Sequence, residues 1–422
     1  MRMPSLSLQQ VAPLRVPIGY FLVGPWFGVF AGLFLGWHGE SAWVSRWTPA
    51  VLGATHLLIL GCIVMVMMGA LVQVLSVISS ASVPAAAWIG PWIRSLLGVG
   101  ATALAFALSY EIRPLFYIAG ICLALSFSAF LAPLIWSLSR RVGGGDSMFA
   151  IRIAVLCLLL TFVLGVLLVG GHVAPERIPG FRSWTGLHLG FGLIGWTTLL
   201  IMAVSFQVLP MFFVAPNYPR WISVGAPVSV PIGLITGNVW ILGAACSVWA
   251  VCTLRVLFLR KRRAPDPVVW FWQLAMVLLG STTAVVWFTN ASELTVGVLF
   301  VVGFILTVMI GMLYKIVPFL VFLHLQRACL SRPERFSKLP TMHTVIPVRR
   351  ARWQFFIHAV AVVMCLGATK SPVLGPWAAV LLAADCAWLG VSIQCGWTCY
   401  RRKLEELDPF VVVSPRTVAP TA

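Results

Sequence analysis

Four histidines of this chain stand where an imidazole could bind a metal. His56 and His188 lie inside long apolar segments, and His38 and His172 lie at the ends of the apolar segments before them. An imidazole in apolar surroundings must satisfy a donor and an acceptor, and binding a metal ion or a haem iron is a common reason for placing one there. The spacing is similar, with 18 residues from His38 to His56 and 16 from His172 to His188. We therefore predict His56 and His188 as haem or metal ligands, with His38 and His172 as further metal candidates.

Each of these histidines also has a structural interpretation. His56 and His188 could be core residues whose ring nitrogens are satisfied by hydrogen bonds, and His38 and His172 could be interfacial residues. The remaining histidines stand at or beyond the cytoplasmic ends of their segments, where an interfacial or loop position is expected. They are His324, His343 and His358.

A second set of polar residues closes three apolar segments that have related sequences. These sequences are Gly69-Ala-Leu-Val-Gln73-Val-Leu-Ser76, Ala203-Val-Ser-Phe-Gln207-Val-Leu-Pro210 and Gly311-Met-Leu-Tyr-Lys315-Ile-Val-Pro318. Gln73, Gln207 and Lys315 therefore fall at one depth, near the cytoplasmic interface, and could form a polar ring facing the bundle interior. Alternatively they anchor helix ends, with Lys315 reaching toward the lipid headgroups.

Asp385 is a lone carboxyl group near the middle of the last apolar segment. A charge at that depth is costly, so Asp385 is either protonated or satisfied by a donor on a neighbouring helix. Lys315 lies too far toward the cytoplasm to be its direct partner. A role in a proton path, together with the three polar helix ends, is one functional interpretation.

The composition requires a membrane to position these side chains. Of the 422 residues, 60% are hydrophobic and only 9% are charged, and apolar segments of membrane-spanning length recur along the chain. The formal charge of +18 comes from short basic clusters between these segments, as the positive-inside rule expects, and does not indicate nucleic-acid binding. The lipid bilayer is therefore the expected environment.

Twelve membrane spans with both termini in the cytoplasm explain the basic clusters best, because every cluster then lies on the cytoplasmic side. The stretch 221–259 must contribute two helices, near 222–237 and 239–259. The other expected spans are 17–37, 50–78, 93–110, 114–138, 150–170, 184–214, 267–289, 294–323, 353–369 and 373–399. We expect 326–351 to be a cytoplasmic loop and 408–422 to be a flexible tail.

The spans divide into three groups of four within a single polytopic domain. The approximate repeats are 14–140, 148–262 and 267–403, and the three related sequences close the second helix of each group. The predicted fold class is thus an all-α integral membrane protein, with twelve transmembrane helices in three pseudo-symmetric four-helix repeats.

This pattern resembles the haem–copper oxidase subunit I superfamily, including the shorter NnrS-like membrane proteins. The resemblance rests on His56, on His188 with the following Leu189-Gly190-Phe-Gly-Leu-Ile-Gly195-Trp196, and on the motifs at Gln207 and Lys315. It implies that His56 matches a low-spin haem ligand and that His188 matches a copper ligand. It also implies haem b and possibly copper as cofactors, a bacterial inner (cytoplasmic) membrane, and other respiratory or cytochrome subunits as partners.

The chain departs from that family where oxygen chemistry would need ligands. The outer half of the span at 294–323, from Glu293 to Gly311, contains no histidine, and the span at 222–237 has no histidine pair. Leu189-Gly190 stands where the oxidases have Pro-Glu. A proton-pumping terminal oxidase is therefore not expected. The resemblance implies a haem- or copper-binding relative without a complete binuclear centre, linked to nitric oxide or respiratory metabolism. The alternatives are a transporter or channel-like protein and a non-catalytic assembly subunit.

Overall fold

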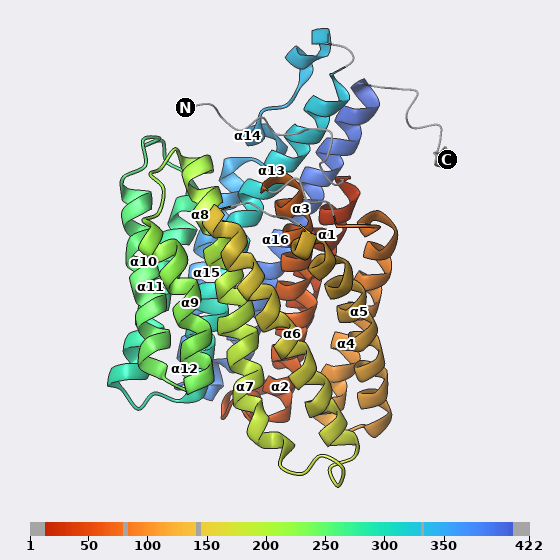
Figure 1. Cartoon of the computed structure of the whole chain (residues 1–422), viewed down its shortest axis with the longest axis vertical. Helices are drawn as coiled ribbons and strands as arrows, with labels where there is room; N and C mark the ends of the chain where they lie inside the picture. The colour runs from red at the N-terminus through yellow and green to blue at the C-terminus, as the bar shows by residue number, and fades with distance from the viewer. Residues whose placement is uncertain (1–12, 79–82, 141–144, 331–332, 408–422) are drawn as a thin grey trace.

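The chain folds as a bundle of long helices (Figure 1). The computed structural model describes residues 13–78, 83–140, 145–330 and 333–407, and these residues contain helices and turns but no strand. Helices suit such apolar segments because each backbone amide and carbonyl finds its partner within the same segment, without water. The predicted all-α class is confirmed, and the predicted tail at 408–422 lies outside the described residues.

The bounds of the helices are as follows. The first eight are α1 (Arg15–His38), α2 (Pro49–His56), α3 (Met65–Ile78), α4 (Ala86–Tyr110), α5 (Arg113–Arg140), α6 (Gly145–Val173), α7 (Thr185–Leu189) and α8 (Leu199–Phe213). The others are α9 (Arg220–Thr236), α10 (Val239–Phe258), α11 (Pro267–Phe288), α12 (Glu293–Gly297), α13 (Thr307–Ala328), α14 (Met342–Val345), α15 (Val348–Ala368) and α16 (Gly375–Leu407). Short 3₁₀ helices are η2 (Gly39–Trp43), η4 (Phe181–Trp184), η7 (Pro333–Lys338) and η8 (Pro372–Leu374).

Eleven helical segments in the described parts of the chain are long and apolar enough to cross a membrane. The stretch 221–259 forms two helices, α9 and α10, as predicted. Gly237 has a left-handed φ of 65° between them, and the Asn238 side chain then caps α10 by accepting from the amides of Trp240 and Ile241. With 17 residues, α9 is shorter than the eleven spanning segments.

Three spans contain a long π-helical segment after their first turns. These segments are η3 (Leu57–Val64) between α2 and α3, η5 (Gly190–Thr198) between α7 and α8, and η6 (Val298–Leu306) between α12 and α13. Each π-helical segment ends nine positions before the polar residue of its related sequence, Gln73, Gln207 or Lys315. π-Helical turns are rare and often mark functional sites. The three related sequences therefore share an unusual backbone as well as residue types.

The starts of these three spans lie at the same end of the bundle. In Figure 1, α2, α7 and α12 are at the bottom, whereas α14 and the end of α13 are at the top. The segment 326–351, expected as a loop, contains η7, α14 and the first residues of α15. Along the bundle, α1 packs so tightly on α16 that a Cβ atom at Gly32 would lie 2.7 Å from the backbone nitrogen of Ala383.

Candidate functional site

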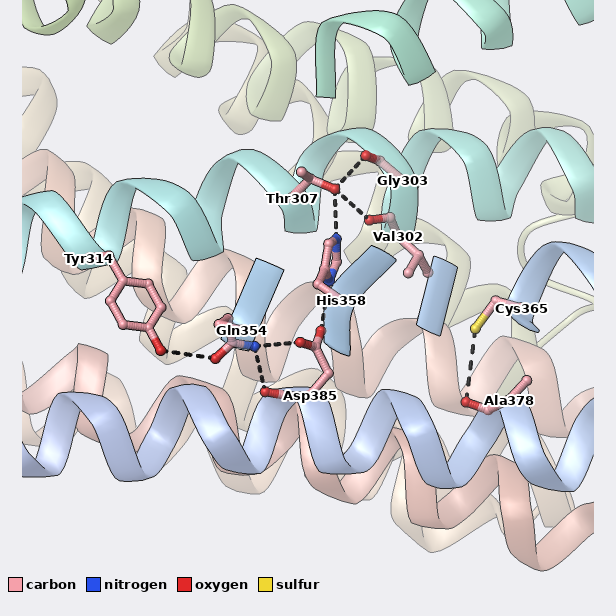
Figure 2. Close-up of polar contacts among 9 residues, drawn as sticks. All are labelled: Val302, Gly303, Thr307, Tyr314, Gln354, His358, Cys365, Ala378 and Asp385. Carbon is pink, nitrogen blue, oxygen red and sulfur yellow. Dashed lines mark hydrogen bonds and ion pairs between the residues drawn. The ribbon is translucent and has the colours of Figure 1, made fainter. Parts of the chain in front are cut away.

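A buried cluster of polar side chains surrounds Asp385 between α13, α15 and α16 (Figure 2). One carboxylate oxygen, Oδ2, lies 2.7 Å from Nδ1 of His358, and the other, Oδ1, accepts a hydrogen bond from Nε2 of Gln354. The side chains of Asp385, His358 and Gln354 are all fully buried. The carboxyl group is therefore satisfied by donors on the neighbouring helix α15, which confirms one of the two alternatives predicted for it.

Three further hydroxyl groups extend this cluster. Tyr314 of α13 donates to Gln354 Oε1 at 3.1 Å, and its hydroxyl oxygen also lies 2.9 Å from the Ser392 hydroxyl of α16. On the opposite side, Thr307 Oγ1 lies 2.7 Å from His358 Nε2. The result is a continuous chain of hydrogen bonds from Tyr314 through Asp385 to Thr307, closed off from water.

Thr307 links this chain to the π-helical segment η6. Its hydroxyl oxygen is 2.5 Å from the carbonyl oxygen of Gly303 and 3.3 Å from that of Val302. The hydroxyl has one hydrogen, which it donates either to η6 or to His358 Nε2. Donation to η6 requires a hydrogen on Nε2, whereas donation to His358 leaves Nε2 bare. The Thr307 hydroxyl can therefore pair with Nε2 whether or not that nitrogen carries a hydrogen.

The prediction that His358 is an interfacial or loop residue was wrong. Because α15 begins at Val348, His358 is the eleventh of its 21 residues and lies deep in the bundle. The sequence signal that was missed is the spacing of Gln354 and His358, which places both on one face of α15. Together with the deep carboxyl group of Asp385, that pair of polar residues could have indicated a shared buried site.

His56 and His188 are placed alike within their spans. His56 is the last residue before η3, and its Nδ1 lies 2.8 Å from the carbonyl oxygen of Leu52. His188 stands two residues before η5, and its Nδ1 lies 3.1 Å from the carbonyl oxygen of Thr161 in α6. Donation from Nδ1 to a carbonyl leaves the lone pair on Nε2, the tautomer of many metal-bound histidines.

The two histidines also lie beside the cavity at the starts of their spans. Their chain neighbours Thr55 and Leu189 line the same cavity, and both histidine side chains are only partly exposed. The ring of His188 fits against Gly165 of α6, where a Cβ atom would lie 3.1 Å from Cε1. The structure therefore places His56 and His188 on two different spans that border the same cavity.

His38 and His172 have different surroundings. His38 hydrogen-bonds the Phe34 carbonyl oxygen at 3.0 Å and contacts the rings of Phe34 and Tyr110. His172 stacks on Phe116 with 4.9 Å between ring centroids. In the described part of the chain, no group of three or more histidine, cysteine, aspartate and glutamate side chains is arranged to hold a metal ion. The four histidines predicted as metal candidates therefore do not form one cluster among the described residues.

The three predicted ring residues have three different environments. Gln73 is buried, and neither atom of its amide has a hydrogen-bond partner among the described residues. Gln207 is exposed. Lys315 forms a salt bridge of 2.7 Å with Asp266, which precedes α11. No described hydrogen bond joins the three residues to one another.

A cavity of about 380 Å³ opens between the starts of the three π-helix-containing spans. Its wall is mostly apolar and includes residues of α2, α7, α10, α11, α12 and η6. Val302, Cys365 and Leu382 also line it, and the Val302 carbonyl oxygen is one of the acceptors near Thr307. Neither His56 nor His188 is in the wall, although their neighbours Thr55 and Leu189 are.

Fold and site together define an all-helical, multi-pass membrane protein with a histidine pair, an apolar cavity and a deeply buried His–Asp pair. No protein-family model matches the chain, and no curated protein is significantly similar to it.

Proposed function

We propose that this protein binds haem b or a copper ion in the membrane through His56 and His188. One observation carries the proposal: each imidazole lies just before a π-helical segment and binds a backbone carbonyl through Nδ1. This arrangement fixes the rings and leaves both Nε2 atoms as potential ligands. Two histidines suffice for a six-coordinate haem iron or for a cuprous ion, and either group would supply one-electron redox chemistry.

The protein's own contribution would be to orient these ligands. Leu52 and Thr161 hold the two rings through their carbonyl oxygens, and Gly165 leaves room for the ring of His188. The π-helical segments that follow both histidines alter the helical register, and such segments frequently accompany functional sites. A mostly apolar environment around the pair would tune the potential of any bound metal.

The scaffold we infer consists of twelve spans in three repeats, like the haem–copper oxidase subunit I superfamily. The matched positions of η3, η5 and η6 support this threefold relationship. The distribution of arginine and lysine supports cytoplasmic termini, and the resemblance supports an inner membrane location. Respiratory or cytochrome subunits are the expected partners, and nitric oxide or respiratory metabolism is the expected setting, both through that resemblance.

Optical and metal analysis of the purified protein tests the proposal. The protein is expressed with haem precursor and copper supplied, and we expect a Soret band or about one copper per chain. His56→Ala and His188→Ala should each abolish the signal. His324→Ala is the matched control, because His324 also bonds a carbonyl four residues earlier through Nδ1 yet lies in α13, away from the pair. Neither haem nor copper in the wild-type protein would overturn the proposal.

A second candidate function, proton-coupled transport, is favoured by the His358–Asp385 pair. Two ionisable side chains are in direct contact here, and through Thr307 they are linked to η6, which lines the cavity. We expect proteoliposomes under an imposed membrane potential to acidify faster with wild-type protein than with Asp385→Asn. Gln207→Ala should behave like wild type, because Gln207 is exposed and outside the cluster. Equal rates for wild type and Asp385→Asn would exclude this function.

A further inference from the structure

The cavity at the starts of the three π-helix-containing spans has a wall without free polar groups on its α11 side. The hydroxyls of Thr282 and Thr283 line it, but they donate to the carbonyls of Leu278 and Leu279 in their own helix. At the mouth, Arg46 pairs with Glu293 at 2.6 Å, so the two opposite charges compensate each other. Two buried N–H groups of the wall, Trp43 Nε1 and Arg46 Nε, make no hydrogen bond among the described residues, although Arg46 Nε keeps its ion pair with Glu293. A neutral ligand with one acceptor atom and an otherwise apolar surface therefore fits best.

Gly297 explains part of the empty space. It lines the cavity, and a Cβ atom added to it would meet no other atom within 4 Å. Gly297 is the last residue before η6, just as His56 is the last residue before η3. The third span thus has a glycine directly before its π-helical segment, and the missing side chain leaves open space. Gly186 of α7 also lines the cavity with nothing within 4 Å of a Cβ atom.

The size of the cavity suits a small molecule. Its volume of about 380 Å³ lies in the range of ligand pockets, roughly 300–1,000 Å³. A mostly apolar wall of this kind favours apolar compounds over polar ones. Tryptophan rings, among them Trp43, Trp47 and Trp287, line the part toward the mouth.

We propose that this cavity is a binding site for a neutral, hydrocarbon-rich molecule, either the acyl chain of a lipid or a free apolar compound dissolved in the membrane. The site is independent of the proposed haem or copper ligands, because neither His56 nor His188 is in its wall. The apolar part of the ligand would occupy the open space beside Gly297 and Gly186. The Arg46–Glu293 ion pair would lie at the entrance.

Quenching of tryptophan fluorescence by brominated probes tests this site. Purified protein is titrated with 1-bromododecane as the linear probe and with 1-bromonaphthalene as the ring-shaped probe. We expect saturable quenching of part of the fluorescence of the 19 tryptophans, because three of them face the cavity. Preference for the linear probe would identify an acyl chain as the occupant, and preference for the ring would identify a free apolar compound.

Substitutions of glycines show whether the quenching probe binds in this cavity. Gly297→Leu and Gly186→Leu each place a side chain in the open space, and we expect at least tenfold weaker binding of the preferred probe. Gly280→Leu is the control, since Gly280 of α11 also has nothing within 4 Å of a Cβ atom but is not in the cavity wall. Thermal unfolding measurements establish whether each variant is folded. If one of the two cavity variants does not fold, the other still tests the site.

The outcomes separate this inference from the proposed cofactor. Quenching that never saturates, or that is equal in wild type and both cavity variants, reflects partition into the detergent and would overturn the inference. His56→Ala should leave probe binding unchanged, and Gly297→Leu should leave any haem or copper content unchanged. Failure of one proposal is therefore visible without failure of the other.

Discussion

Nδ1 of His358 lies 2.7 Å from Oδ2 of Asp385, and neither side chain has any exposed surface. The two residues are on consecutive helices, α15 and α16, and Gln354 donates to the second carboxylate oxygen. A buried ionisable pair costs desolvation energy, which hydrogen bonds and mutual attraction offset only when the geometry is good. Here every oxygen of the carboxyl group has a donor, so the pair can persist at this depth.

Replacing one member of this pair should destabilise the protein strongly. We expect Asp385→Leu to cost about 3–5 kcal/mol, because His358 and Gln354 are left buried without their acceptor. The double replacement His358→Leu with Asp385→Leu should cost less than the sum of the single changes, since no unpaired charge remains. Thermal or denaturant unfolding in detergent measures both effects. Additive costs would show that the two side chains are not coupled.

The two buried glutamines should respond in opposite directions to the same change. Gln73 has no hydrogen-bond partner for either amide atom among the described residues, whereas Gln354 bonds Asp385 and Tyr314. We expect Gln73→Leu to raise the free energy of unfolding by about 1 kcal/mol, since an unsatisfied buried amide is unfavourable. Gln354→Leu should lower it by about 2 kcal/mol or more. A loss of stability in Gln73→Leu would mean that the Gln73 amide is bound by a ligand or water.

Two glycines one turn apart on α1 provide a test of the α1–α16 packing. A Cβ atom at Gly32 would lie 2.7 Å from the nitrogen of Ala383 and 2.8 Å from the carbonyl oxygen of Ala379, which are backbone atoms that cannot turn away. At Gly36 the nearest atom would be 3.6 Å away, an ordinary contact. We expect Gly32→Ala to cost about 1–3 kcal/mol and Gly36→Ala to be close to neutral. Similar unfolding temperatures for the two variants would argue against this close approach.

Hydropathy and loop charge were enough to predict much of the fold. The division of 221–259 into two helices followed from its length and the charge of Arg260–Arg263, and the turn falls at Gly237 and Asn238. The need of Asp385 for a donor on a neighbouring helix followed from the cost of a buried carboxyl group. Both inferences rest on free energies that are local to the sequence and large in a membrane.

The location of the donor did not follow, because it depended on where a helix begins. Hydropathy placed the start of the span at residue 353, but α15 begins at Val348 and includes Arg349, Arg350 and Arg352. Five more residues turn His358 from an interfacial residue into a central one. The π-helical segments were also missed, since neither residue type nor periodicity distinguishes them from α-helix. The related sequences at Gln73, Gln207 and Lys315 indicated that the three spans are related, but they did not predict the π-helical backbone that the spans share.

The salt bridge between Lys315 and Asp266 joins two spans through one carboxylate. Asp266 Oδ2 lies 2.7 Å from Lys315 Nζ, while Oδ1 accepts from the amide of Val268 and caps α11. Asp266→Asn keeps a capping oxygen but loses the charge, so we expect a cost of about 1 kcal/mol. Asp266→Ala loses both interactions and should cost about 2 kcal/mol.

Salt separates the two contributions of Asp266. The side chains of Lys315 and Asp266 are 13% and 21% exposed, so their attraction is partly screened by ions. The cost of Asp266→Asn should therefore shrink between 50 mM and 1 M salt, and Lys315→Met should show the same dependence. The extra cost of Asp266→Ala over Asp266→Asn should stay constant, because a capping hydrogen bond is local. Unfolding temperatures of the three variants at both salt concentrations provide the measurement. A salt-independent cost for Lys315→Met would show that Lys315 acts through packing, for example on the Phe213 ring 5.1 Å from its Nζ, and not through its charge.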